Sequence, residues 1–274
     1  MRAGQGSLAV GQHPLADPAT PTDAGQHPLA GITRLIEQVL ASVTEVAEAM
    51  TAVAVGRQAL SRSDLGVLRP LVADVLYRHR GFAAGAGVVL APDVLADVPR
   101  WIDWWWADQG AGIGRLDVDL DPESAEFYDY TTTEWYREPA RTGRPCVAGP
   151  YVDYICTRKY TFTLSVPVTD GSVFLGVAGA DILAGEVERM ALAALSRLGG
   201  PAVLASGGGR VIASTTATIL PGTVLPGTVL RRGQPGQPDS MCQLSVAGSQ
   251  PWLLFREPAQ FPWMNAPPPG TQPG

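Results

Sequence analysis

The sequence has little of what most enzyme sites and metal sites use. Its 274 residues include only three cysteines and three histidines. His13 and His27 lie in an N-terminal segment rich in Gly, Pro and Ala, which leaves His79 for histidine chemistry. This scarcity excludes most catalytic triads and His-rich metal sites, and the cysteine spacing fits neither a zinc site nor a disulfide framework. We therefore predict no catalytic residue, no bound metal and no cofactor.

Clustered positive charge and long apolar runs are also lacking. The chain carries 20 basic and 26 acidic residues, a net charge of −6, with no basic run. This balance argues against a nucleic-acid partner. No stretch approaches the roughly 20 apolar residues of a membrane span, and no secretory signal precedes Gly31. We expect a soluble, cytoplasmic protein, and the near absence of lysine is typical of a GC-rich bacterial gene.

What is present predicts a folded α+β protein. Hydrophobic residues make up 46% of the chain. Apolar residues recur every three or four positions over Ile32–Leu60 and predict one long helix. A single small core does not need so long a helix. We expect it to lie along two lobes, and pairing with a second copy as a homodimer is also compatible with its length.

Further elements follow along the chain. Strands are expected at 100–107, with four tryptophans whose default interpretation is core packing, and at 115–120, where apolar and acidic residues alternate. Asp121-Pro122-Glu123 predicts the start of a helix that runs to about Tyr130. The remaining expected helices and strands, which together favour an antiparallel sheet, are 65–79, 88–90, 134–141, about 152–155, 160–168, 173–181, 185–198, 202–205, 210–214, 243–246 and 252–255.

Residues 127–153 concentrate tyrosine and tryptophan among few aliphatic side chains. Amphipathic aromatics of this kind suit the wall of a ligand pocket. Asp181 ends the apolar run 173–180, where an ionised carboxylate is costly unless it is paired. A cationic ligand enclosed by aromatic rings would satisfy Asp181 and Asp153. The alternative is that Asp181 caps the following helix and Asp153 lies in a turn.

Four motifs occur in order along the same region: YDYTTTEWY at 128–136, TGRP at 142–145, GPYVD at 149–153 and LGVAGADI at 175–182. In these motifs the chain resembles the Cache family of PAS-related sensor domains, and the double-Cache type in particular. The resemblance covers about 123–183. It implies a long N-terminal helix packed on a PAS-like antiparallel sheet, followed by a smaller second β lobe.

The resemblance also implies a binding site. In family members that bind amino acids, an arginine two residues before the Trp holds the ligand carboxylate, while a Tyr and two Asp hold its amino group. The amino-group set matches Tyr151, Asp153 and Asp181, whereas Thr133 stands at the arginine position. Threonine cannot form the bidentate pair that arginine forms with a carboxylate, so the resemblance favours an amine. The ligand-binding residues we expect are Tyr128, Thr133, Trp135, Tyr136, Tyr151, Asp153 and Asp181.

We predict four segments. Residues 1–30 are expected to be disordered, 31–200 to form the Cache-like ligand-binding domain, 201–257 a smaller and degenerate second lobe, and 258–274 a Pro-rich tail. The expected function is a sensor that binds a small amine and passes its signal to a separate regulator protein. Three alternatives stay open: an amino-acid sensor, a dimerisation module with a vestigial pocket, and an enzyme using Asp153 and Asp181 as an acid/base pair.

Overall fold

The computed structural model describes residues 27–108, 112–155, 159–226, 241–246, 248 and 250–256. The predicted N-terminal segment and Pro-rich tail lie almost wholly outside these ranges, and so does Cys156. Within them, Cys146 and Cys242 are free thiols.

The helices and strands follow the predicted order, but the first helix ends at Ala54 and not at Leu60, and the strand predicted at about 152–155 lies earlier and ends at Val152, before a turn. The helices are α1 (Ala30–Ala54), η1 (Arg62–Leu68), α2 (Arg69–Arg78), η2 (Tyr130–Thr132), α3 (Glu134–Thr142), α4 (Ala184–Leu195) and η3 (Ser196–Leu198). The strands are β1 (Ala83–Leu90), β2 (Trp101–Asp108), β3 (Gly112–Arg115), β4 (Cys146–Val152), β5 (Tyr160–Asp170), β6 (Val173–Leu183), β7 (Ala202–Ala205), β8 (Val211–Ser214), β9 (Met241–Leu244) and β10 (Trp252–Arg256).

The described strands form two antiparallel sheets. The larger has the order β3-β2-β1-β6-β5-β4 and the smaller has the order β8-β7-β10-β9. In the larger sheet, Asp181 on β6 lies opposite Gly85 on β1 and opposite Thr163 on β5. The predicted α+β class, with a long helix, an antiparallel sheet and a smaller β lobe, is confirmed.

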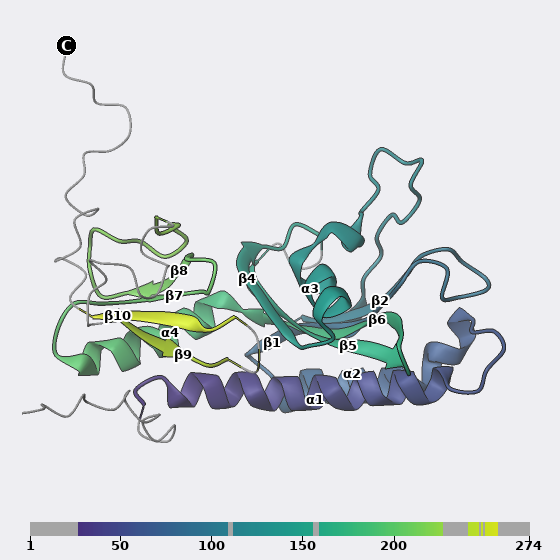
Figure 1. Cartoon of the computed structure of the whole chain (residues 1–274), viewed down its shortest axis with the longest axis horizontal. Helices are drawn as coiled ribbons and strands as arrows, with labels where there is room; N and C mark the ends of the chain where they lie inside the picture. Colours follow the sequence, from purple (N-terminus) through teal and green to yellow (C-terminus); the bar gives the residue numbers. More distant parts are fainter. Residues whose placement is uncertain are drawn as a thin grey trace, which may run out of the picture.

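Helix α1 lies along both sheets (Figure 1). Its buried residues repeat at helical spacing, so one apolar stripe faces inward. A single hydrophobic core joins this stripe to residues of the larger sheet, of α4 and of the smaller sheet, including Leu204 and Trp252. At 1.5 Å per residue, 25 residues span about 38 Å. This length lets one helix support two lobes, as the sequence predicts.

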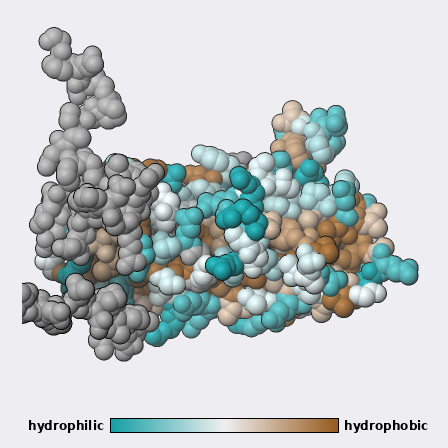
Figure 2. All heavy atoms as spheres, in the orientation of Figure 1, coloured by the Kyte–Doolittle hydropathy of each residue, from teal (hydrophilic) through white to brown (hydrophobic). Residues whose placement is uncertain are grey.

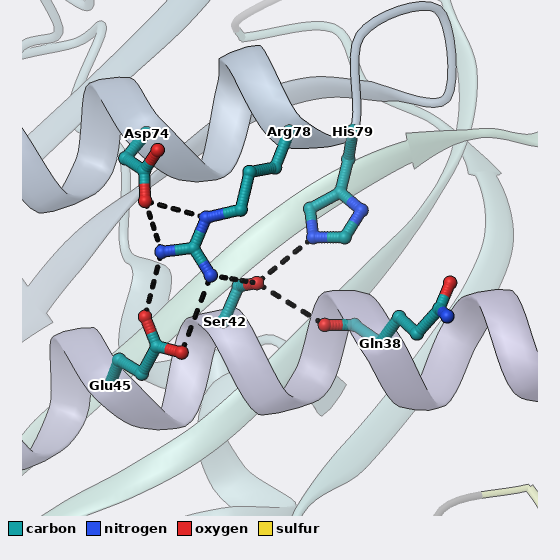
Figure 3. Close-up of polar contacts among 6 residues, drawn as sticks. All are labelled: Gln38, Ser42, Glu45, Asp74, Arg78 and His79. Carbon is teal, nitrogen blue, oxygen red and sulfur yellow. Dashed lines mark hydrogen bonds and ion pairs between the residues drawn. The ribbon is translucent and has the colours of Figure 1, made fainter.

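Polar contacts fasten α2 to the middle of α1 (Figure 3). The Arg78 guanidinium bridges Asp74 on its own helix and Glu45 on α1. His79, which ends α2, places Nε2 2.9 Å from Oγ of Ser42. Burial, and next the charge of Arg78, lower the pKa of His79, so the ring is neutral at pH 7. Ser42 is only 4% exposed, so this pair serves to join two helices.

The two faces of the larger sheet have different roles. Alternation along β5 sends Phe162 and Leu164 into the core shared with α1, while Thr163 and Ser165 face the other way. On that second face, a separate apolar cluster packs β1, β2, β4 and β6 against the segment 116–136. We call this segment the roof. The space between sheet and roof is where the aromatic and acidic residues singled out in the sequence gather.

Two predicted elements in this region are absent from the structure. Residues 116–120 alternate as predicted, but β3 ends at Arg115 and they pack without pairing as a strand. The helix predicted from Asp121 to Tyr130 is a series of turns. There the side chains of Asp119, Asp121 and Ser124 accept hydrogen bonds from backbone N–H groups two residues ahead. These local bonds compete with the helical pattern.

Polar side chains line the edge along α1, and hydrophobic ones gather toward the opposite end of the molecule from the small sheet (Figure 2). Arg34, Glu37, Glu45 and Glu48 are exposed on α1. The homodimer through this helix stays a prediction.

Within the described residues, no helix combines the length and apolar character needed to cross a membrane.

Candidate functional site

A small cavity of about 40 Å³ lies between the larger sheet and the roof. A cavity needs about 10–15 Å³ to hold one water molecule, so this cavity admits a ligand of a few non-hydrogen atoms without any movement of the protein. The sheet, the roof and the turn after β4 all contribute. The lining residues are Val89, Ile102, Trp104, Tyr151, Thr163 and Asp181 from the sheet, Leu116, Tyr128 and Trp135 from the roof, and Asp153 and Ile155 from the turn.

Asp181 forms the polar centre of the cavity. It is 5% exposed, and the Thr163 hydroxyl donates to its Oδ1 at 2.5 Å. The Tyr151 hydroxyl is bonded to Thr163 Oγ1 in turn. Because the single hydroxyl proton of Thr163 goes to Asp181, Tyr151 is the donor in the second bond. Three adjacent strands, β4, β5 and β6, thus supply a directed chain of hydrogen bonds that ends on the carboxylate.

Burial raises the pKa of Asp181 to about 7, against 3.8 for an ordinary aspartate. The hydrogen bond from Thr163 opposes this rise, and the nearby charge of Asp153 adds to it. Among the described residues that line the cavity, none is a cation. The described lining thus holds two acids and no basic residue. Because burial makes the Asp181 carboxylate costly to ionise alone, a cation that enters the cavity would stabilise its charged form.

The indole ring of Trp104 lies across β1 toward β6. A Cβ on Gly85 would stand 2.6 Å from its Nε1, and one on Gly179 would stand 3.1 Å from its Cη2. Glycines on two strands thus make room for the ring. Nε1 is buried and forms no hydrogen bond with a described residue. It lies near enough to Asp181 to lower the pKa of that carboxyl, yet not in hydrogen-bonding geometry.

Replacing Gly85 by Ala is expected to destabilise the protein by about 1–3 kcal/mol, because the new methyl group forces the indole ring to move. Chemical denaturation measures the change. Gly185→Ala in α4 is the matched control, since its Cβ would meet nothing within 4 Å, and it should be neutral or slightly stabilising. Equal effects of the two substitutions would contradict the close packing of Trp104 on β1.

Hydrogen bonds hold the roof above the sheet. The Tyr130 hydroxyl donates to the carbonyl of Leu90 at 2.8 Å, where β1 ends. The Ser165 hydroxyl donates to the carbonyl of Trp135 at 2.6 Å, which fixes the start of α3. Both donors are buried, so each bond costs about 1–3 kcal/mol to leave unmade. These bonds place Tyr128 and Trp135 over Asp181.

Arg100 supports the roof from outside the cavity. Its guanidinium lies 5.1 Å from the ring centre of Phe127 and 5.9 Å from that of Tyr130. It also stands 3.5 Å from Oδ1 of Asp129. Arg100 is not a lining residue of the cavity, so it braces the turns of the roof.

Asp153 begins the turn that closes the cavity after β4. Its Oδ1 accepts a hydrogen bond from the N–H of Ile155 at 3.1 Å, and its own N–H donates to the carbonyl of Lys159 at 2.9 Å. The side chain is therefore part of a turn, as one reading of the sequence had it, and it also lines the cavity.

The structure brings five of the seven expected ligand-binding residues around one cavity: Tyr128, Trp135, Tyr151, Asp153 and Asp181. Thr133 and Tyr136 do not line it. The Thr133 hydroxyl donates to the carbonyl of Tyr130 at 2.7 Å, and the Tyr136 ring packs edge-on against Tyr130, Trp135 and Phe174. The alternative in which Asp181 caps the next helix is wrong, because Leu183 occupies that position without a side-chain cap.

Six lining residues were not predicted from the sequence, and two of these, Thr163 and Trp104, bring polar groups to the cavity. Thr163 gives a signal only through the polar side of β5, where Thr161, Thr163 and Ser165 alternate with core residues. Gly85 and Gly179 leave room for the ring of Trp104, but no local sequence pattern shows that these two glycines lie beneath one ring. No group of three or more His, Cys, Asp or Glu side chains in the described part of the chain is arranged to hold a metal ion.

Comparison with known proteins bears on the fold of this chain. Residues 83–188 match the family model described as methyl-accepting chemotaxis protein-like, first PDC sensor domain. A search of the curated proteins finds no match.

Solved structures share the fold. Methyl-accepting chemotaxis protein X superposes with a TM-score of 0.55 at 18% identity, covering 83% of this chain and 94% of that one. The extracellular domain of a candidate histidine kinase, soHK1S-Z6, gives 0.56 at 18% identity, covering 85% and 90%. An extracellular ligand binding receptor from Desulfohalobium retbaense DSM5692 gives 0.53 at 11% identity, covering 84% and 38%. At these identities the likeness is one of fold.

Proposed function

We propose that this protein senses a small amine, starting from the premise that residues 83–188 form a Cache-like sensor domain of the PDC type. The matched family model describes a sensor domain, so we prefer ligand sensing to the acid/base enzyme alternative for Asp153 and Asp181. The observation that carries the amine proposal is the buried carboxylate of Asp181, in a cavity whose described lining includes a second acid and no cation.

The same geometry argues against an amino acid as the ligand. A bound carboxylate would face the buried Asp181 with no arginine among the described lining residues to balance it. Thr133 stands at the position of the family's arginine, and its hydroxyl is already bonded to the backbone. The sequence offers Arg137 and Arg144 as substitutes, but both are exposed and neither lines the cavity. An ammonium group without a neighbouring carboxylate fits this charge distribution.

Signalling is proposed to run through the larger sheet. Asp181 lies on β6, whose other face belongs to the core shared with α1. A ligand that binds one arrangement of roof and sheet more tightly would shift the population toward it and alter the packing of α1. A homodimer or a separate regulator protein would read this change. A cytoplasmic location is proposed on the sequence alone.

The proposal is tested by thermal unfolding of the purified protein with matched pairs of ligands. Each pair joins an amine to the amino acid that differs from it by one carboxylate, such as ethylamine with alanine. At 100 times its dissociation constant a ligand adds about 2.7 kcal/mol to the free energy of unfolding. For a chain of this size that corresponds to a rise of roughly 5 °C or more in Tm. The amines are expected to give this rise and the amino acids are not.

The other outcomes point elsewhere. A rise with amino acids alone would contradict the amine proposal and mean that another residue holds the carboxylate. No rise with any ligand, together with a stable dimer by light scattering, would favour the dimerisation module with a vestigial pocket.

A further inference from the structure

The donors and acceptors of the cavity are not all used. Tyr151 donates to Thr163, and Thr163 donates to Oδ1 of Asp181. That chain ends on Oδ1, and the donor nearest to Oδ2 of Asp181 among the described residues is the indole N–H of Trp104, which lowers the pKa of the carboxyl without completing a well-aligned hydrogen bond. Nε1 of Trp104 is a buried donor with no well-aligned partner in the described structure. The cavity therefore presents a carboxylate oxygen and, beside it, an indole donor that has no well-aligned partner.

These two atoms lie close together. The point that a Cβ of Gly85 would occupy is 2.6 Å from Nε1 of Trp104 and 3.2 Å from Oδ2 of Asp181. The whole Trp104 side chain is nearly buried, at 5% exposure, and it lines the cavity. A buried N–H of this kind is normally paired. A group that occupies the cavity can thus meet an acceptor and a donor side by side.

We infer that Trp104 determines ligand specificity, by donating a hydrogen bond to an oxygen that the ligand carries next to its ammonium group. This inference rests on the proposed function and narrows it: the ligand class becomes small polar amines such as β-amino alcohols, with the ammonium on Asp181 and the oxygen on Trp104. A purely alkyl amine leaves the indole N–H unpaired. Sites with a buried donor of this type discriminate against analogues that lack the acceptor.

The cavity size agrees with this class. About 40 Å³ admits only a few non-hydrogen atoms unless the roof moves. An ammonium and a hydroxyl on neighbouring carbons form a molecule of that size. The aromatic rings of Tyr128 and Trp135 would cover its carbon atoms.

The test compares ethanolamine with n-propylamine, which have equal numbers of non-hydrogen atoms and differ by one hydroxyl in place of a methyl group. Dissociation constants are measured by calorimetry on the whole chain at pH 8. The wild-type protein is expected to bind ethanolamine at least about tenfold more tightly. Trp104→Phe, which keeps an aromatic ring and removes the N–H, is expected to bring the ratio close to one.

Trp105→Phe is the matched control. Nε1 of Trp105 is also buried without a described partner, but this ring packs under Arg69 and belongs to the core on the other side of the sheet. It should keep the wild-type preference. If both amines bind the wild type equally, or if Trp104→Phe keeps the preference, the inference fails and the amine proposal survives. If neither amine binds, the amine proposal fails and the inference fails with it.

Discussion

Replacing Asp181 by Asn is expected to weaken the binding of a small amine by at least about 100-fold. The variant removes the buried counter-charge of the ammonium group. Deleting one partner of a buried ion pair costs about 3–5 kcal/mol, and each 1.4 kcal/mol is a factor of ten in affinity. Calorimetric titration of the variant with the amine that gives the largest rise in Tm measures the loss.

The same variant should fold as well as the wild type. Asn has the shape of Asp, and its carbonyl oxygen can still accept the hydrogen bond from Thr163. At pH 8 it also removes a buried carboxylate that the free protein must hold ionised without a cationic lining residue. Its Tm without ligand is therefore expected to equal or exceed that of the wild type at this pH. Loss of binding with a retained fold separates a ligand contact from a structural role.

Asp170→Asn supplies the control for net charge. Asp170 is exposed at the far end of β5, so it removes the same charge without touching the cavity. It should bind the amine as the wild type does. Equal affinity of the wild type and Asp181→Asn would contradict the assignment of Asp181, and equal weakening by both variants would indicate a general electrostatic effect.

Amine affinity is expected to rise about tenfold per pH unit up to pH 7 and to level off above it. The pKa of Asp181 is raised to about 7 by burial, so below pH 7 the free protein carries a proton there. That proton must leave before the carboxylate can pair with an ammonium. A primary amine with a pKa near 10 stays charged throughout this range, so the change belongs to the protein. Dissociation constants at pH 5, 6, 7 and 8 provide the measurement.

Calorimetry at pH 6 in two buffers of different ionisation enthalpy gives an independent readout. Binding should release close to one proton at pH 6 and almost none at pH 8. Asp181→Asn should show neither the release nor the slope. A constant affinity from pH 5 to pH 8 would mean that Asp181 is already ionised in the free protein.

The contribution of Asp181 to the free energy of unfolding of the ligand-free protein should fall as pH rises, whereas the amine affinity rises. Because the pKa of Asp181 is higher in the folded chain than in the unfolded one, the folded state binds more protons between about pH 4 and pH 7. The contribution of Asp181 to the free energy of unfolding is therefore fully present below pH 4 and is lost as pH rises to 7, at about 1.4 kcal/mol per unit. The difference between wild type and Asp181→Asn isolates this contribution from other titrating groups.

The sequence by itself determined the elements that rest on local periodicity. The 3.6-residue repeat of apolar side chains specifies α1, and the two-residue alternation of β5 specifies which of its side chains face the core. The motifs with Trp135, Tyr151, Asp153 and Asp181 predicted one pocket through their resemblance to Cache sensors, which supplies a tertiary arrangement that local periodicity does not contain. Those residues do meet around the cavity.

Local signals failed where two local structures compete. Asp121-Pro122-Glu123 is a sound helix start, yet Asp119, Asp121 and Ser124 form turns with the backbone instead. Packing of Leu116, Val118 and Leu120 against the second apolar cluster holds these turns in the roof. The turns thus rest on local side-chain hydrogen bonds together with packing against residues that lie far away in the sequence.

Only the tertiary structure decided the chemistry of the pocket. Thr163 joins Tyr151 to Asp181 because β4, β5 and β6 are neighbours in one register, and register depends on pairing across the sheet. Trp104 reaches Asp181 because glycines of β1 and β6 leave room for its ring. The raised pKa of Asp181 likewise follows from burial, which is a property of the assembled fold. Sequence spacing determines which face a side chain takes, whereas the partner it meets there depends on which strands the fold places side by side.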